Sequence, residues 1–245
     1  MIDKKKIQRF YDSFKAGDYG KHTSIYEQEG RLFAMLSLVN LQEKEFVLDI
    51  GCGVGFLTRQ YANLARGRVT GIDLSPESIN KAKNKAVEDG LDNIEFAIMD
   101  AEELHFKNDA FDCIICSELL EHLLDPLKAL KEMNRVVKPQ GQIVITTPNA
   151  WRVVPWRMVL GVLGHRYERQ LYDQPLSPLK LNKLVKDAGL RIIKRKGTYY
   201  VPLFIPPRRR VYGAFVRLSM LLEKANLLPY LGLYQVCLLH PNRRL

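Results

Sequence analysis

An acidic residue stands directly before a glycine-rich turn in the stretch VLDIGCGVG, residues 47–55. Asp49 lies at the end of the apolar run, and glycines follow at positions 51, 53 and 55. Such a turn between a strand and a helix presents backbone N–H groups and a helix N-terminus to a ligand. Dinucleotide sites use the spacing G-x-G-x-x-G, which differs from the spacing here. Asp49 would repel a pyrophosphate and attract an amino group or a sulfonium, although an aspartate can also simply cap a turn.

Two further acids end the apolar runs that follow. Asp73 lies 18 residues past Gly55, where a carboxylate can accept hydrogen bonds from both ribose hydroxyls. Asp100, followed by Ala101 and Glu102, could accept one from an adenine amino group. Each acid alone can be a helix cap or a turn residue. Three acids at the carboxyl ends of successive strands predict a ligand site there, and S-adenosylmethionine (AdoMet) brings both the amino group and the sulfonium.

Alternating apolar runs and helical patterns must position these acids. Strands are expected at Phe46–Ile50, Arg68–Ile72, Ile94–Met99, Phe111–Cys116 and Gln142–Thr147, and helices at Phe56–Ala65, Pro76–Asp89 and Pro126–Val137. Ser75 is the expected N-cap of the second helix, and Pro139 with Gly141 predicts a turn before the fifth strand. The alternation predicts an α/β fold with a parallel, doubly wound sheet.

The remaining residues complete a single predicted domain over 1–245. Residues 1–45 form a helical cap that includes a helix at Tyr26–Leu41, 46–149 form the ligand-binding core, and 150–176 form a lid-like insertion. Residues 177–245 complete the sheet, with a helix near Pro178–Ala188, a strand near Arg191–Lys196, a helix at Val211–Ala225 and a last strand at Leu233–His240.

The net charge of +10 arises entirely from the C-terminal part of the chain. Residues 191–245 hold 11 Lys and Arg and a single acid, Glu223. This excess indicates either a solvated basic face or contact with an anionic membrane surface or an acidic partner.

Targeting and cysteine signals favour a cytoplasmic protein, with peripheral membrane contact left open. The N-terminus lacks the apolar run of a secretory signal, and the cysteines do not resemble a disulfide framework. Cys113 and Cys116 have CxxC spacing, but on one strand they would point to opposite faces, so we expect no metal there.

Five motifs in order give the sequence a resemblance to the class I AdoMet-dependent methyltransferases: VLDIGCGVG, VTGIDLS, IMDAEELHF, FDCIICSELLEH and RVVKPQGQIVITTPN. The resemblance implies a Rossmann-like, seven-stranded sheet with an antiparallel last strand and helices on both faces. It also implies cofactor contacts: Gly51, Cys52 and Gly53 around the methionine portion, Asp73 and Leu74 at the ribose, Asp100 and Ala101 at the adenine, and Ser117 near the sulfonium.

A closer similarity is to the ubiquinone-pathway O-methyltransferases. In that family an arginine upstream of the first strand contacts AdoMet, and Arg31 lies at the matching separation from Gly51. The counterparts of Glu118, Glu121 and His122 bind Mg²⁺ in some members, where the ion would lower the pKa of a hydroxyl. Without a metal, His122 could be the general base. The LEH run also occurs in members of the broader family that have no metal.

The resulting expectation is an AdoMet-dependent O-methyltransferase acting on a small or lipid-linked hydroxylated substrate. N- or C-methylation and a non-catalytic AdoMet-binding role remain alternatives. An NAD-linked oxidoreductase predicts G-x-G-x-x-G and no acid at position 49, and both expectations fail. A nucleic-acid methyltransferase is disfavoured because the Asn-Pro-Pro-aromatic signature for base amines is missing.

Overall fold

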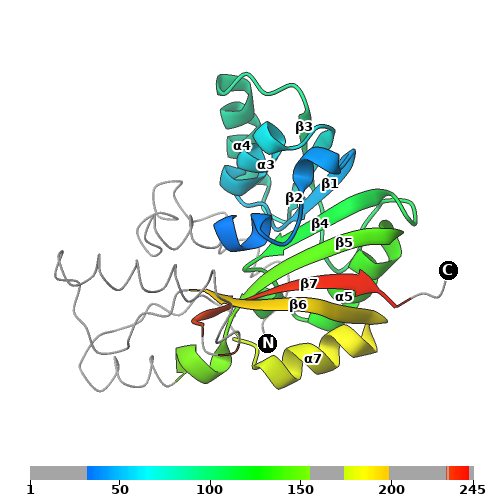
Figure 1. The fold of residues 1–245 in the computed structure, drawn as a ribbon. Coiled ribbons are helices and arrows are strands. Elements are labelled where there is room, and N and C mark those ends of the chain that lie inside the picture. The colour runs from blue at the N-terminus through cyan, green and yellow to red at the C-terminus, as the bar shows by residue number, and fades with distance from the viewer. Residues whose placement is uncertain (1–31, 155–173, 199–229, 231, 243–245) are drawn as a thin grey trace, which may run out of the picture.

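The computed structural model describes residues 32–154, 174–198, 230 and 232–242, which form one seven-stranded sheet with helices on both sides (Figure 1). In chain order the elements are β1 (Phe46–Ile50), α3 (Phe56–Leu64), β2 (Arg68–Asp73), α4 (Pro76–Glu88), β3 (Ile94–Ile98), β4 (Phe111–Ser117), α5 (Pro126–Val136), β5 (Val137–Pro148), α7 (Pro178–Asp187), β6 (Leu190–Thr198) and β7 (Tyr234–Pro241). Two short 3-10 helices, η1 (Leu41–Glu43) and η2 (Leu120–His122), precede β1 and follow β4.

The strand order is β3-β2-β1-β4-β5-β7-β6. The first five of these strands are parallel to one another, and β7 runs antiparallel to both β5 and β6. The predicted fold class is therefore confirmed, including the antiparallel last strand. The chain moves from β1 to one side of the sheet and then returns to β4 on the other, so the carboxyl ends of β1 and β4 flank a topological switch point, where ligands bind in such sheets.

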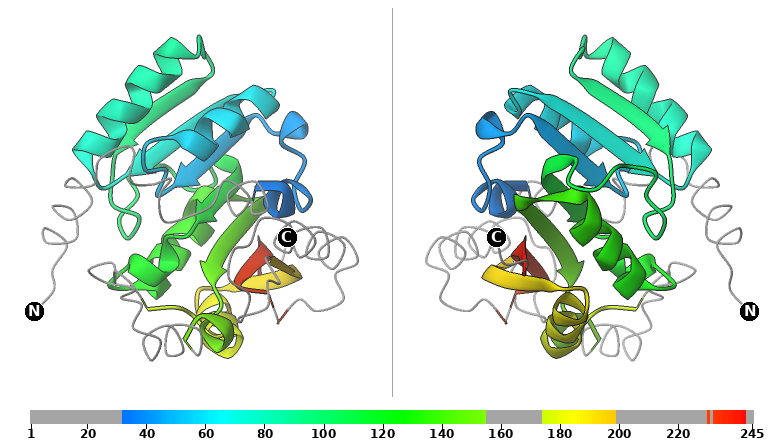
Figure 2. Two further views of the ribbon diagram at one scale, coloured as in Figure 1. Left: turned by 90° about the vertical axis from the view of Figure 1, so that its left-hand side faces the viewer. Right: turned by 90° about the vertical axis from the view of Figure 1, so that its right-hand side faces the viewer.

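Each face of the sheet is covered by its own helices (Figures 1 and 2). Residues 32–41 and α3 pack on one face with Val47 and Cys113, and α4 covers Phe96. Helices α5 and α7 pack on the other face, where Cys116 is buried. Cys113 and Cys116 thus point to opposite faces, as predicted from the alternation of a strand.

Three helices begin in the same way, with a capping side chain followed by proline at the first helical position. The side-chain oxygens of Ser75, Asp125 and Ser177 accept hydrogen bonds from backbone N–H groups in α4, α5 and α7 at 3.1, 3.0 and 3.2 Å. The predicted N-cap at Ser75 is confirmed. These caps start helices that then bury one apolar stripe each: Ile79, Ala82 and Ala86 in α4; Ala129, Leu130, Met133 and Val136 in α5; Leu181 and Val185 in α7.

The turn predicted at Pro139 and Gly141 is wrong, because β5 already starts at Val137. Phe111 pairs with Val137, and the next pair joins Cys113 to Gln142, so the residues between lie in an irregular stretch of the strand. Gly141 fits this stretch because a Cβ there would lie 2.6 Å from Val137 Cγ2. The chain leaves α5 directly into pairing with β4, and the irregularity takes the place of a turn.

The N-terminal helix is shorter than expected where it can be described. Residues 32–36 are helical, a turn follows, and η1 begins at Leu41. The helix predicted at Tyr26–Leu41 therefore stops at residue 36, before its predicted end at Leu41. The helix predicted at Val211–Ala225 lies outside the described residues.

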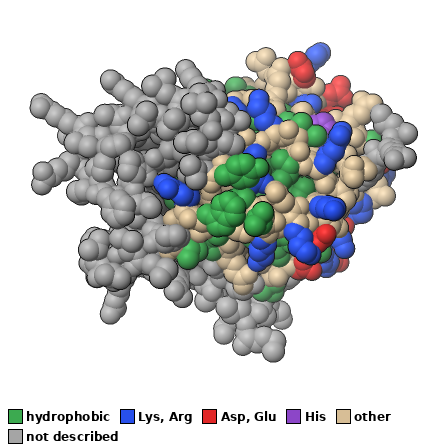
Figure 3. Space-filling model, turned by 60° about the horizontal axis from the view of Figure 1, so that its bottom comes forward, with side chains coloured by type: hydrophobic (Ala, Val, Ile, Leu, Met, Phe, Trp, Pro, Cys, Tyr) green, Lys and Arg blue, Asp and Glu red, His purple; other side chains and the backbone are tan. Residues whose placement is uncertain are grey.

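Within the described ranges no helix is long and apolar enough to cross a membrane. Figure 3 shows one face, on which hydrophobic side chains gather with Lys and Arg around them.

Candidate functional site

The glycine-rich turn lies at the switch point, and its backbone requires glycine. Gly51, Gly53 and Gly55 have φ of 75°, 53° and 72°, in the left-handed region that favours glycine. Contacts add a second requirement at Gly55, where a Cβ would lie 2.8 Å from Phe96 Cζ and 2.9 Å from Ala82 Cβ. The turn is therefore packed against β3 and α4, and it holds the start of α3.

The N–H groups of this turn are already bonded inside the protein. Those of Gly51 and Cys52 donate to Ile72 O at 2.8 and 2.9 Å, and that of Gly53 donates to Asp73 Oδ2 at 2.8 Å. Our expectation that these N–H groups face a ligand is therefore wrong for these three residues. A phosphate needs such donors, so the turn is poorly suited to a phosphate and is better suited to a ligand that is itself a donor or a cation.

Asp49 is buried beneath the turn, on the face that α3 covers. Its Oδ2 accepts a hydrogen bond of 2.6 Å from Thr58 Oγ1, and the side chain is 3% exposed. Burial raises the pKa of Asp49 to about 7, the Thr58 hydrogen bond opposes this, and the nearby Asp73 adds to it. A cation at the switch point would favour the ionised form. Burial and the two acids also raise the pKa of the Cys52 thiol, which disfavours the reactive thiolate form.

Asp73 joins the turn after β2 to the glycine-rich turn. Its two carboxylate oxygens accept from Gly53 N at 2.8 Å and from Ser75 N at 2.9 Å, and the residue stays partly exposed. Leu74 beside it is also partly exposed. At the end of β3, Asp100 Oδ1 accepts from Glu102 N at 2.8 Å, and Ala101 is buried in the core. The three predicted acids thus lie at the carboxyl ends of β1, β2 and β3, and their assigned contacts with AdoMet remain predictions.

Ser117 ends β4 and belongs to a chain of side-chain hydrogen bonds with β5. Its Oγ lies 3.0 Å from Thr146 Oγ1, which in turn donates to Glu118 Oε1 at 2.8 Å. Glu118 has a φ of 54°, a left-handed conformation that is uncommon outside glycine. Its backbone N–H donates to Thr146 O. Thr146 therefore fixes both the backbone and the side chain of Glu118.

Glu121 and His122 in η2 form the second half of this group. Glu121 is 1% exposed, and its Oε2 accepts from Thr147 Oγ1 at 3.0 Å. His122 Nε2 lies 3.9 Å from Glu121 Oε1, and the imidazole is mostly buried. The arrangement holds an imidazole near a buried carboxylate, at a separation longer than a hydrogen bond.

The same residues do not fit the predicted Mg²⁺ site. No group of three His, Cys, Asp or Glu side chains within the described ranges converges as metal ligands do. The carboxylates of Glu118 and Glu121 accept instead from Thr146 and Thr147. Mg²⁺ also prefers an octahedral shell of oxygens rather than a histidine. We therefore derive no step through a metal.

Sequence reasoning missed the residues that hold the site in place. Thr146 and Thr147 are separated from their glutamate partners by 28 and 26 residues, so no local spacing indicates them. Glu102 is buried, and its Oε1 accepts from Asp125 N, which ties the turn after β3 to the start of α5. Arg135 donates to Leu104 O and Phe106 O in the same turn. Its i, i+3 spacing from Glu132 was the one signal available.

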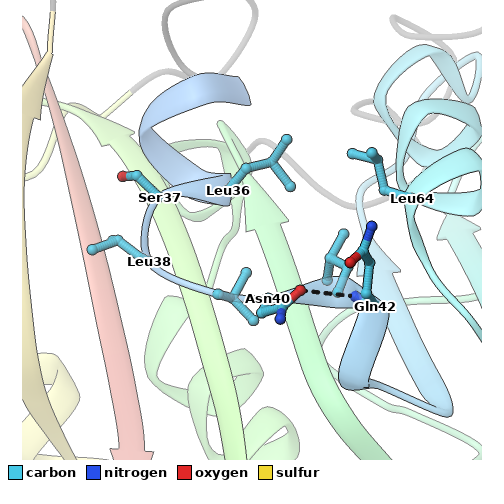
Figure 4. A pocket seen from close by; sticks show the side chains of 8 residues that line it. Leu36, Ser37, Leu38, Asn40, Gln42 and Leu64 are labelled. Carbon is cyan, nitrogen blue, oxygen red and sulfur yellow. Dashed lines mark hydrogen bonds between the residues drawn. The ribbon is translucent and has the colours of Figure 1, made fainter.

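Two other features lie apart from this site. Arg31 is outside the described residues. A pocket of about 520 Å³ is lined by residues 36–42 and Leu64 (Figure 4). Leu64 ends α3 and η1 precedes β1, so this pocket lies towards the amino ends of the strands, away from the switch point.

Comparison with known proteins gives the class of protein. A family model described as a methyltransferase domain matches residues 41–187. A ubiquinone biosynthesis O-methyltransferase of Coxiella burnetii is 32% identical over 213 residues, covering 82% of this chain and 88% of that protein. A protein of the same name from Xanthomonas axonopodis is 31% identical over 164 residues, covering 64% of this chain and 66%, just under two thirds, of that protein.

Solved structures show the same fold. A methyltransferase of Haloferax volcanii, in complex with the Trm112 activator, superposes with a TM-score of 0.70 at 19% identity, covering 98% of this chain and 99% of that one. An AdoMet-dependent methyltransferase from Aquifex aeolicus has a TM-score of 0.59 at 24% identity, covering 76% and 93%. The family model and the Coxiella relative, together with the shared fold, identify the chain as a class I AdoMet-dependent methyltransferase. The chain belongs to the methyltransferase-domain family, with the matched region running from η1 to the end of α7.

Proposed function

We propose that this protein transfers the methyl group of AdoMet to a hydroxyl oxygen of a small or lipid-linked hydroxylated substrate. The observation that carries the proposal is the polar group at the carboxyl end of β4. There Thr146 and Thr147 of β5 hold Ser117, Glu118 and Glu121 at the switch point of the sheet, and His122 lies 3.9 Å from Glu121. The two relatives named as ubiquinone biosynthesis O-methyltransferases support an oxygen acceptor.

The cofactor site supports AdoMet through its charges. AdoMet supplies a methyl group activated on a positively charged sulfur. Asp73 places negative charge beside the turn, and a cation there would favour the ionised form of Asp49, while the N–H groups of Gly51 and Gly53 are already bonded. Asp73 at the end of β2 is partly exposed and is the residue that we assign to the ribose. The chain thus attracts a cationic nucleoside to the edge where β4 ends.

His122 is the residue we assign to proton transfer. Oxygen attack on the methyl carbon forms the new C–O bond as the C–S bond breaks, and the hydroxyl proton must leave. An imidazole can take it near neutral pH. Glu121, 3.9 Å away and fixed by Thr147, stabilises the imidazolium that results. The rest of the rate enhancement comes from holding acceptor oxygen, methyl carbon and sulfur in line.

A pair of histidine variants tests this assignment. His122→Gln should lower kcat by about 10²–10⁴-fold with the Kd for AdoMet unchanged in calorimetry. His105→Gln, at an exposed position, is the matched control and should retain full activity. The assay uses AdoMet with catechols carrying either a short or a polyprenyl chain. Full activity of the His122 variant would overturn the role of the base, and methylation of an amine or a carbon instead would favour the N- or C-methyltransferase alternative.

Binding without turnover is the other alternative. A non-catalytic AdoMet-binding protein would show the calorimetric signal for AdoMet and would release no demethylated cofactor with any acceptor. Mass spectrometry after incubation with AdoMet and a lipid extract distinguishes the two outcomes, because a catalyst leaves an acceptor in which a methyl group has replaced a hydrogen atom.

A further inference from the structure

One face of the protein combines exposed hydrophobic side chains with an excess of lysine. We call it the α7–β6 face. It comprises the exposed hydrophobic residues Trp151, Val154, Leu179, Ile193 and Tyr230 and the exposed cations Lys180, Lys183 and Lys186 of α7. In Figure 3 hydrophobic side chains lie together in the middle of the view, with Lys and Arg on several sides.

The contacts of these elements hold the face together. Helix α7 packs on β6. Arg195 of β6 donates to Asn182 of α7 and lies over the ring of Tyr230, with its guanidinium carbon 5.0 Å from the ring centroid. Asn149 Nδ2 donates to Tyr230 O at 2.8 Å, just before Trp151 in the chain. The aromatic residues are thus anchored through their backbone or ring while each remains about half exposed, at 49% for Trp151 and 47% for Tyr230.

The charge of this face is positive. Helix α7 carries three lysines against one acid, Asp187, which pairs with Lys183 at 2.9 Å. Strand β6 contains no acid, and neither does β7 beside it. A surface of this sign attracts anionic groups and repels a second copy of itself.

We propose that the α7–β6 face docks the protein on an anionic membrane surface. Exposed aliphatic residues such as Leu179, which is 67% exposed, suit the acyl boundary, while tryptophan and tyrosine suit the headgroup level. A nucleic acid would match the cations but not the aliphatic side chains. Lysines on the edge strand β6 also hinder pairing with a strand of another protein.

The position of the face gives this docking a consequence for the reaction. Trp151 follows β5 by three residues. The same strand carries Thr146 and Thr147, which hold Glu118 and Glu121 in place. Gln174 N, close to the start of α7, donates to Glu121 O at 2.9 Å. The docked face therefore adjoins the edge of the sheet where the acceptor must enter. This inference goes beyond the proposed function, because binding to a membrane requires no methyl transfer.

Vesicle binding with matched charge variants tests the proposal. Binding of the full chain to vesicles of phosphatidylglycerol and phosphatidylcholine is measured by co-sedimentation at low salt, without AdoMet or acceptor. Each cation near the surface contributes roughly a factor of five. The variant K180Q/K183Q/K186Q should therefore bind on the order of 100-fold more weakly. K81Q/K83Q/K85Q on α4 removes the same charge elsewhere and should change binding little.

A second pair tests the apolar contacts. Leu179→Ser should weaken vesicle binding by about tenfold, in line with the loss of one buried leucine, while Val87→Ser, 80% exposed on α4, should leave it unchanged. All four variants alter exposed or half-exposed positions, and unchanged thermal unfolding confirms that they fold. Three results would overturn the proposal: no binding to anionic vesicles at low salt, equal losses in the two lysine triples, or tighter binding to duplex DNA than to the vesicles.

Discussion

Asp49 shows how a single side chain is shaped by its surroundings at the site. The sequence has an acid before the glycine-rich turn. The structure shows that the side chain of this acid is almost fully buried and accepts a hydrogen bond from the hydroxyl group of Thr58. A carboxylate in such a place is poorly solvated until a cation arrives. The burial that raises its pKa also prepares it for a positively charged ligand.

Asp49→Asn should remove a pH dependence of stability in the ligand-free protein. The folded pKa is raised from 3.8 to about 7, so the unfolded chain loses this proton first as the pH rises. Above pH 4 the free energy of unfolding therefore falls with pH, by up to about 4 kcal/mol near pH 7 and above. The asparagine variant lacks this loss, so it should be more stable than wild type at pH 8 and similar at pH 4. Urea unfolding at both pH values measures the difference, and parallel pH profiles for the two proteins would contradict it.

Asp73→Ala should weaken AdoMet binding by roughly 10- to 100-fold, the range expected when a charged hydrogen bond is lost. The carboxylate of Asp73 also supports Gly53 and Ser75, so unfolding must be measured alongside. Asp92→Asn, at an exposed position before β3, is the control and should bind AdoMet normally. Isothermal calorimetry gives both Kd values. An unchanged Kd for the Asp73 variant in a folded protein would remove the ribose assignment.

The residues of the site were predictable only in part. Asp49, Asp73, Asp100 and Ser117 stand at strand ends, where strand periodicity and the following turn indicate them. Thr146 and Thr147 read as ordinary strand residues, because their roles depend on the pairing of β5 with β4, which a single sequence does not display. In the same way, the N–H groups of the turn were expected to face a ligand, and only the tertiary structure shows their internal acceptors.

At the scale of elements, helix starts were predicted well and irregular strands were not. Ser75 and Asp125 precede prolines at the first helical position, a strong local signal. The stretch after Val137 carries Pro139 and Gly141, a pattern that indicates a turn. Pairing with β4 overrides it and draws the residues into β5. The local preference of the residues determines the secondary structure where no tertiary contact competes with it. Where strand pairing competes, the pairing determines the secondary structure.

Gly55→Ala should destabilise the protein by about 3 kcal/mol, because two effects add. The left-handed φ of 72° costs a non-glycine residue about 1 kcal/mol, and the new methyl group would overlap Phe96 and Ala82 at 2.8 and 2.9 Å. Gly90→Ala separates these effects, since Gly90 has a φ of 68° and no atom within 4 Å of the added Cβ. It should cost only about 1 kcal/mol. Equal losses in chemical unfolding would show that packing at the turn contributes nothing.

At the scale of the whole molecule, the class of fold followed from the alternation of strands and helices. Five parallel strands were predicted from the sequence alone, each within about one residue except the start of β5. The antiparallel β7 came from the family resemblance, because nothing in the residues Leu233–His240 specifies direction. Polar contacts that join distant segments could not be predicted from the sequence, because their partners lie 13 to 83 residues apart in the chain.

Arg195 joins the last two strands to α7, and we expect its replacement to lower the free energy of unfolding of the whole protein. The guanidinium is buried, and it donates to Gln235 of β7 and Asn182 of α7 while lying over Tyr230. Arg195→Met would keep much of the volume and leave Gln235 Oε1 buried without this donor. We expect a loss of about 2–4 kcal/mol in the free energy of unfolding, from one charged hydrogen-bond network and one cation–π contact.

Arg191→Met on the same strand is the matched control, because Arg191 is exposed and should change stability by less than about 0.5 kcal/mol. Hydrogen exchange shows where the loss acts. If Arg195 holds β6 and β7 onto the parallel strands, amides of both strands should lose protection in the Arg195 variant before those of β1 and β4, whose pairing does not involve it. A uniform loss of protection across the sheet would instead mean that the seven strands unfold as one unit and that Arg195 contributes only to their total stability.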